Sequence, residues 1–163
     1  MLEITNAEEQ DFEEIWPIFK NICSTGDTYV FSPEVCPETA KAVWFGDKYS
    51  THVAKLDGKI VGAYVIRPNH RGELSNHIAN AAYIVDSSQR GHGIGRALGE
   101  HSLQTAKNLG YKAIQFNFVV STNVTAINLW KSLGFQIAGT IPEGYQHQQL
   151  GKLVDIHIMH KEL

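Results

Sequence analysis

The feature that most constrains this chain is a turn with three alternating glycines, placed between an apolar segment and an amphipathic one. The turn has the sequence Gln89-Arg90-Gly91-His92-Gly93-Ile94-Gly95-Arg96. Residues 76–85 end in an apolar run that is typical of a central strand, and the residues after the turn predict a helix to Leu109, closed by Gly110. Alternating glycines let backbone N–H groups converge, and the start of a helix adds a positive end. The turn therefore predicts a site for an anion such as a pyrophosphate.

Two common phosphate-binding patterns do not fit this turn. A dinucleotide fingerprint needs Gly or Ala where Arg96 or Leu98 stands, and a Walker A loop needs Gly-Lys followed by Ser or Thr. The turn also follows the fourth predicted strand and not the first, which argues against a Rossmann fold. A tight strand-to-helix turn that binds no ligand remains an alternative at this stage.

The whole chain reads as one domain over residues 1–163, because no repeat, linker or low-complexity tract interrupts it. Asn6 with Glu9 predicts a capping box, Pro17 predicts a kink or break in the first helix, and Asp57-Gly58 predicts a hairpin. The order βααβββαβαββ predicts an α/β fold, with a mixed sheet and helices on its faces. We expect strands over 2–5, 51–56, 59–66, 76–85, 113–120, 135–141 and 153–159, and helices over 12–23, 38–45, 94–109 and 123–133.

Composition excludes several classes of protein. The net charge is −3 and no stretch concentrates basic residues, so we expect no nucleic-acid partner. The longest uncharged apolar run extends only from Ile60 to Ile66, whereas a membrane span needs about 20 residues. The N-terminus lacks the apolar region of a secretory signal, and two cysteines, Cys23 and Cys36, are too few for a disulfide framework. These features predict a cytoplasmic protein with reduced thiols and no membrane association.

Two motifs give the chain a family resemblance. Arg90-x-x-Gly93-x-Gly95 matches the acyl-CoA pyrophosphate motif of the GCN5-related N-acetyltransferases. Asn123-x-x-Ala126-x-x-Leu129-Trp130-x-x-Leu133-Gly134-Phe135 resembles a later segment of the same family. The similarity covers essentially the whole chain and includes the order of helices and strands. It implies the family fold, in which the sheet splays open between its fourth and fifth strands, and acetyl-CoA as co-substrate.

The resemblance also implies where acetyl-CoA binds. The backbone N–H groups of residues 91–96 would hold the pyrophosphate, with Gln89 and Arg90 beside them. The strand edge near Ile84 and Val85 would pair with the pantetheine arm, and the amide of Asn123 would contact that arm from the other side. No metal is implied. Members of this fold often form homodimers, although the sequence carries no interface signature.

Two positions depart from the family pattern. Trp130 stands where many relatives have a tyrosine that protonates the leaving thiolate, and an indole N–H can donate a hydrogen bond but not a proton at neutral pH. Tyr145, another residue or water would then take that role, or the thiolate would leave unprotonated. Trp130 itself would line the thioester or simply pack between helix and sheet.

The second departure concerns the general base. Residues 76–85 contain no Asp or Glu, although many relatives have a glutamate there. An alkyl amine with a pKa of about 10.4 needs ~4–5 kcal/mol to lose its proton at pH 7, so an acceptor for that proton is required. His77, Asp155 and His157 are candidates, each with a structural role as the alternative. His157 and His160 differ in strand parity and do not form a metal pair.

Asparagines in apolar strands point to the acceptor site. Asn80 and Asn117 lie on adjacent central strands, where an unused amide is unfavourable. The segments Asn80-Ala81-Ala82-Tyr83-Ile84-Val85 and Phe116-Asn117-Phe118-Val119 resemble the fungal acetyltransferases that detoxify azetidine-2-carboxylate, a proline analogue. This resemblance implies that the two asparagines position substrate and thioester. Satisfying the backbone at a β-bulge is the alternative.

These observations predict an acetyl-CoA-dependent N-acetyltransferase that acts by direct attack of a small amine, such as an amino acid or a proline-like imino acid. The predicted loops 24–37 and 142–152 carry Tyr29, Phe31 and Tyr145, which would line a lidded acceptor pocket. Acetylation of a protein N-terminus is a second hypothesis and would need an open groove. A non-catalytic acyl-CoA sensor is a third, motivated by the missing tyrosine and glutamate.

Overall fold

The computed structural model describes all residues from Met1 to Leu163 and has the predicted order of elements. The strands are β1 (Leu2–Asn6), β2 (Ser50–Leu56), β3 (Lys59–Pro68), β4 (Ile78–Val85), β5 (Ala113–Val120), β6 (Gln136–His147) and β7 (Lys152–Glu162). The α-helices are α1 (Phe12–Thr25), α2 (Pro37–Trp44), α3 (Ile94–Asn108) and α4 (Val124–Ser132), and two short 3₁₀ turns lie at Glu9–Asp11 and Ser87–Gln89. No helix is both long and apolar enough to cross a membrane.

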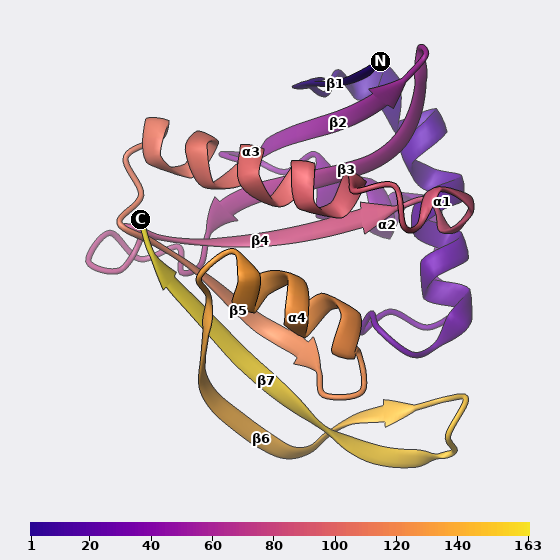
Figure 1. Ribbon diagram of the computed structural model, residues 1–163, viewed down its shortest axis with the longest axis vertical. Coiled ribbons are helices and arrows are strands. Elements are labelled where there is room, and N and C mark those ends of the chain that lie inside the picture. Colours follow the sequence, from indigo (N-terminus) through magenta and orange to yellow (C-terminus); the bar gives the residue numbers. More distant parts are fainter.

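The seven strands form one open sheet in the order β1-β2-β3-β4-β5-β7-β6. Every neighbouring pair is antiparallel except β4 and β5, which run parallel and pair only at Ile78 with Ala113 and at Ala79 with Ile114. Beyond these residues the two strands diverge, as Figure 1 shows. The predicted splay between the fourth and fifth strands is confirmed, and we call this opening the split.

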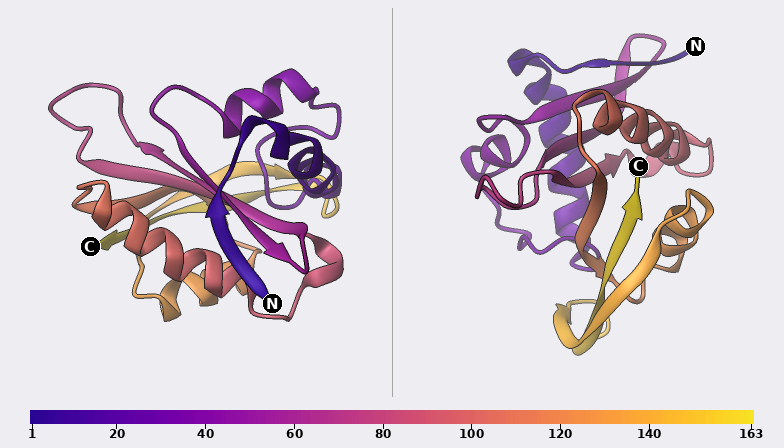
Figure 2. Two further views of the ribbon diagram at one scale, coloured as in Figure 1. Left: turned by 90° about the horizontal axis from the view of Figure 1, so that it is seen from above. Right: turned by 90° about the vertical axis from the view of Figure 1, so that its left-hand side faces the viewer.

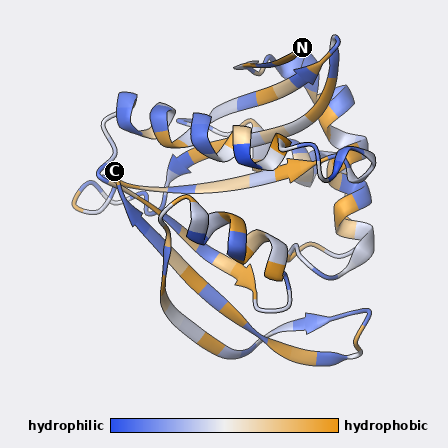
Figure 3. Ribbon diagram, viewed as in Figure 1, coloured by the Kyte–Doolittle hydropathy of each residue, from blue (hydrophilic) through white to orange (hydrophobic).

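Helices cover both faces of the sheet, with α1 and α2 on one face and α3 and α4 on the other (Figure 2). The core on the α1–α2 face is centred on Ile15, Phe19 and Trp44, none of which is exposed. The core on the α3–α4 face includes Leu98, Trp130 and Met159. Alternate residues of each central strand enter these two cores, which is why β3 and β4 are hydrophobic along most of their length (Figure 3).

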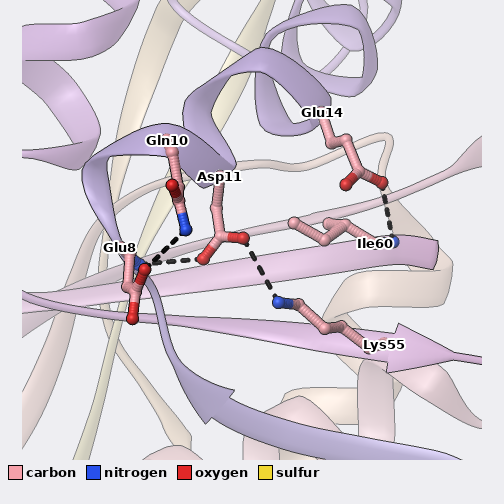
Figure 4. A network of polar contacts seen from close by, with 6 residues as sticks. All are labelled: Glu8, Gln10, Asp11, Glu14, Lys55 and Ile60. Carbon is pink, nitrogen blue, oxygen red and sulfur yellow. Dashed lines mark hydrogen bonds and ion pairs between the residues drawn. The ribbon is translucent and has the colours of Figure 1, made fainter. Parts of the chain in front are cut away.

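Polar contacts fasten the start of α1 to the β2–β3 hairpin (Figure 4). The Glu14 carboxylate accepts a hydrogen bond from the Ile60 N–H at 3.1 Å, and Lys55 pairs with Asp11 at 3.2 Å. The capping box is formed by Glu8 and Asp11, and the prediction of Asn6 with Glu9 was wrong. The reason is that β1 continues through Asn6, whose cross-strand partner is His52, so the first turn begins two residues later.

Two further predictions need correction. Pro17 does not break α1, which is continuous from Phe12 to Thr25. The segment 142–152 is not a loop, because β6 extends to His147 and β7 begins at Lys152. A register shift in the β6–β7 pair between Ile141 and Tyr145 accommodates Pro142 and Gly144 on an edge strand, where a missing N–H costs little.

Candidate active site

The glycine turn forms a backbone cradle at the start of α3. Gly91 and Gly93 have φ values of +83° and +76°, which favour glycine, and Gly93 is the N-cap residue of the helix. A Cβ atom at either position would meet no protein atom within 4 Å, so the space in front of both is open. The N–H groups of residues 91–96 donate no hydrogen bond within the chain, and the first helical bond is donated by Ala97 to the Gly93 carbonyl. Six unpaired N–H groups at a helix N-terminus fit a pyrophosphate.

Side chains around the cradle leave its mouth free. The Arg90 side chain is exposed, and the His92 ring bonds to the Gln89 carbonyl at 3.3 Å. Arg96 turns away toward α4, where it donates to Ser132 at 2.7 Å and pairs with Glu100 at 3.2 Å. Ile94 is buried in the core, so only its backbone belongs to the cradle.

The register of β3 with β4 decides which backbone groups of β4 face the split. The Asp86 N–H donates to the Val61 carbonyl and the Asn69 N–H donates to the Ile78 carbonyl, both at 2.8 Å. In an antiparallel pair this directs the backbone groups of even-numbered β4 residues to β3 and those of odd-numbered residues to the other side. Val85 therefore presents its backbone to the split, together with Tyr83 and Ala81. Ile84, which the family resemblance had suggested as well, directs its backbone groups to β3.

The α3–α4 side of the split is aromatic. Trp130 is 8% exposed and its ring lies 4.6 Å from Tyr83 and 4.8 Å from Phe116, centroid to centroid. Its indole N–H makes no hydrogen bond in the chain, so packing alone fixes the ring. Asn123 begins α4, and its side-chain oxygen accepts from the Ala126 N–H at 3.3 Å, which leaves the amide NH₂ free.

A chain of amide groups lies across the narrow end of the split. Asn80 is half-buried and donates to the Gln115 carbonyl at 3.0 Å, which bridges β4 and β5 where their backbone pairing stops. The Gln115 side chain donates to the Asn117 oxygen at 2.9 Å, and Asn117 in turn donates to the Asn69 oxygen at 2.7 Å. Asn117 is exposed, and both ends of its amide are engaged. Asn80 keeps its side-chain oxygen free.

Asn117 and Phe118 lie at an irregularity in β5. The register with β7 shifts between Phe116 and Val119, so two residues of β5 oppose one residue of β7. Such a bulge leaves local backbone groups unpaired and redirects side chains. It turns Phe118 toward Tyr145, whose ring centroid is 5.6 Å away, and so builds one wall of a pocket.

A pocket of about 630 Å³ opens beside the split on the face covered by α1 and α2. Tyr29, Phe31 and Tyr145 all line it, together with Phe118 and the side chains at 146 and 148. The Tyr29 hydroxyl donates to the Tyr83 carbonyl at 2.8 Å, and the Tyr145 hydroxyl donates to the Tyr29 carbonyl at 3.0 Å. Burial raises the pKa of Tyr29 far above its usual value, so this hydroxyl keeps its proton as a donor.

The segment after α1, which lines the pocket, is hydrogen-bonded to the turn between β6 and β7. The Gln148 N–H, in the turn between β6 and β7, donates to the Gly26 carbonyl at 2.9 Å, and Gln149 donates to the Thr25 carbonyl at the same distance. Glu34 is the one charged side chain among the lining residues. Sequence reasoning overlooked Glu34 and Asn69 because each stands in an ordinary polar context along the chain. It also missed Gln115, although a polar residue in the apolar segment 113–120 is the same signal that identified Asn117.

None of the three candidate bases lines this pocket. His77 borders a smaller cavity at the closed end of the split, beside Lys112 and His160. The Asp155 carboxylate accepts from the Glu143 N–H at 3.0 Å and supports the irregular β6–β7 pairing. The His157 ring bonds to the Thr140 hydroxyl at 2.8 Å. These contacts place Asp155 and His157 in the β6–β7 pair and outside the pocket lining.

The remaining titratable groups offer no metal site or reactive thiol near the pocket. No group of three or more His, Cys, Asp or Glu side chains is arranged to hold a metal ion. Both cysteines are free, and burial raises the pKa of the Cys23 thiol to about 11. Cys23 is therefore a protonated core residue at neutral pH.

Comparisons with known proteins agree with this geometry. The sequence model of the acetyltransferase (GNAT) family matches residues 5–135, so the chain belongs to this family. A solved structure, that of a GCN5-related N-acetyltransferase from Kribbella flavida, superposes with a TM-score of 0.92 and 40% identity, covering 99% of this chain and 98% of that one. The predicted fold class is thereby confirmed.

Two curated relatives also match. N-acetyltransferase aca1 of Schizosaccharomyces pombe is 38% identical over 107 residues, which are 64% of this chain and 51% of the relative, so the match spans about half of that protein. L-amino acid N-acetyltransferase AaaT of Escherichia coli is 29% identical over 143 residues, which are 84% of each chain. The first match agrees with the fungal resemblance of the sequence.

Proposed function

We propose that this protein transfers the acetyl group of acetyl-CoA to the amine of an amino acid or a proline-like imino acid. The observation that carries the proposal is the arrangement around the split. A cradle of unpaired N–H groups lies at one end of β4 on the α3–α4 side, and an aromatic pocket lies on the opposite face. Both reach the same strand edge at Tyr83 and Val85. A cofactor and an acceptor entering from the two faces would meet there.

The cofactor half would be held mainly by backbone. Residues 91–96 would bind the pyrophosphate, Val85 would pair with the pantetheine arm, and the free NH₂ of Asn123 would reach it from α4. Acetyl-CoA supplies the activated acetyl group when it is bound. Trp130 would line the thioester without supplying a proton, since an indole N–H is not an acid at neutral pH.

The acceptor half would orient the amine against the split. The free oxygen of Asn80 can accept a hydrogen bond from an amine, and Tyr29 holds the β4 edge through its bond to the Tyr83 carbonyl. The amine must first lose a proton, which at pH 7 costs about 4–5 kcal/mol for a pKa near 10.4. Glu34 carries the only carboxylate among the lining residues. A water molecule in the pocket would accept the proton from the amine and pass it to Glu34.

The loop that lines the pocket narrows it and favours a small acceptor over a protein N-terminus. The Tyr145 hydroxyl donates to the Tyr29 carbonyl, and the Gln148 N–H, which donates to the Gly26 carbonyl, fastens that loop. An extended peptide would need an open groove in that place. The name of the relative AaaT supports an amino-acid acceptor. The location is the cytoplasm in this proposal, and the protein acts without a metal.

A thiol-release screen tests the proposal. Purified protein with acetyl-CoA is offered amino acids, imino acids, polyamines and N-terminal peptides, and free CoA is measured. We expect turnover with amino or imino acids and little with peptides. Turnover only with peptides would favour the N-terminal acetyltransferase, and acetyl-CoA binding without any turnover would favour the sensor.

A further inference from the structure

Arg67 is a cation without an acidic partner close to the narrow end of the split. It lies at the end of β3, and its side chain is half-buried. All four ion pairs of the chain involve other residues. Its contacts are one hydrogen bond of 3.3 Å from Nη1 to the Val43 carbonyl and a position 5.3 Å above the ring of Tyr49. A guanidinium has five N–H donors, so most of them are uncommitted.

The position of Arg67 joins it to the acceptor side. It is the direct cross-strand partner of Asn80, so both side chains project from the same face of the sheet. This is the face of α1, α2 and the aromatic pocket, since Ala63 and Val65, four and two residues earlier on β3, enter the core beneath α1. Burial raises the pKa of Tyr29 and the positive charge of Arg67 opposes that rise, which puts the two groups within electrostatic range.

A half-buried cation loses part of its hydration, and an ion pair normally offsets that cost. Arg67 has no such ion pair. The Val43 and Tyr49 contacts hold the guanidinium but do not neutralise it. Its planar fork matches a carboxylate, to which it can donate two parallel hydrogen bonds. An acceptor with a carboxylate would supply the missing partner.

We propose that Arg67 binds the carboxylate of the acceptor and thereby selects amino and imino acids over simple amines. This inference rests on the proposed function and deepens it. Arg67 would hold the carboxylate at the narrow end of the split, beside Asn80. The rest of the acceptor would extend toward the aromatic pocket.

The test compares an amino acid with its carboxamide as acceptors, and variants of Arg67 with a control variant of Arg71. Arg67→Gln and Arg67→Lys are assayed with an accepted amino acid and with its carboxamide, which keeps the amine but lacks the charge. Arg71→Gln is the control, because Arg71 is an exposed arginine on the following loop with no ion pair or hydrogen bond. Hydrogen bonds to a charged group contribute about 1.5–3 kcal/mol. We therefore expect Arg67→Gln to lose roughly 10- to 150-fold in kcat/KM on the acid and less than about threefold on the carboxamide.

Arg67→Lys should retain part of the activity on the acid, and Arg71→Gln should match the wild type. Equal losses on acid and carboxamide, or no loss on the acid, would overturn the inference and leave the proposed function standing. A wild-type enzyme that acetylates only amines without a carboxylate would overturn both. The unmodified protein gives a check that does not depend on folding of the variants. A desamino carboxylate should inhibit competitively against the acceptor, whereas its amide should not, and equal inhibition by both would contradict the role of Arg67.

Discussion

The two sides of the split are built in different ways. The proposed cofactor side is built mainly from one continuous segment, residues 85–96, which offers backbone N–H groups, and α4 adds Asn123 and Trp130. The proposed acceptor side would draw on five separate segments, which contribute Tyr29, Arg67, Asn80, Phe118 and Tyr145. A backbone site serves a ligand that is common to a whole family, whereas a side-chain site can change with each substitution. In the proposed function, specificity for the acceptor would therefore reside on the α1–α2 face.

The largest effect is expected when the backbone site is blocked. Gly93→Val should reduce acetyl-CoA affinity at least about a hundredfold, because the side chain would occupy the open space before the cradle, and losing two bonds to a charged group costs at least about 3 kcal/mol. Isothermal calorimetry on folded protein measures this. Gly110→Val is a matched control at the other end of α3, since Gly110 also has a positive φ, +85°, and open space. Equal losses in both variants would mean that backbone strain is responsible.

The next effect separates the two asparagines on the acceptor side. Asn80→Ala should lower kcat/KM on the best amino-acid substrate about 10- to 150-fold, because it removes a free acceptor and the bridge to Gln115. Asn117→Ala should cost less than about fivefold, since both ends of that amide are already engaged by Gln115 and Asn69. Steady-state kinetics measures kcat/KM of both variants, and acetyl-CoA binding, which should be unchanged, is the control. Equal losses would place Asn117 at the substrate as well, and wild-type values for both would make the asparagines structural.

A smaller effect is expected at the Tyr29 hydroxyl, which links the pocket to the edge of β4. Tyr29→Phe removes the hydrogen bond to the Tyr83 carbonyl and should lower kcat/KM roughly two- to tenfold, the equivalent of about 0.5–1.5 kcal/mol. Tyr111→Phe is the control, because the Tyr111 hydroxyl makes no hydrogen bond and lies outside the pocket. A loss of several hundredfold in Tyr29→Phe would instead assign the hydroxyl to proton transfer.

The smallest effect on turnover is expected at Trp130. Trp130→Phe should change kcat by no more than about threefold, because the ring is held by packing and supplies no proton, whereas general acid–base groups contribute about 10²–10⁴. Thermal unfolding should show the larger change, since a smaller ring leaves space in the aromatic cluster. A loss above about 10³ in Trp130→Phe, with folding and acetyl-CoA binding intact, would make the indole catalytic.

Predictions from the sequence succeeded where neighbouring residues determine the structure. The strand before the glycine turn, the helix after it and the Asp57-Gly58 hairpin depend on local spacing, and each is present. The errors lie where distant segments compete with the local pattern. Pro142 and Gly144 are typical of a loop, yet they lie within β6 because the residues on both sides of them, Ile141 and Tyr145, pair with β7. The first capping box moved because β1 pairs with β2 through Asn6.

The sequence by itself determined the order of elements and the anion cradle, because periodicity and glycine spacing act within a few residues. The tertiary structure alone decided which side chains share the proposed acceptor site. Arg67 faces the same way as Asn80 only because β3 and β4 pair in one register, and Asn117 is held by Asn69 across a separation of 48 residues. Contacts of that kind depend on how strands pair and where a bulge falls, and neither is encoded in the spacing of any single motif.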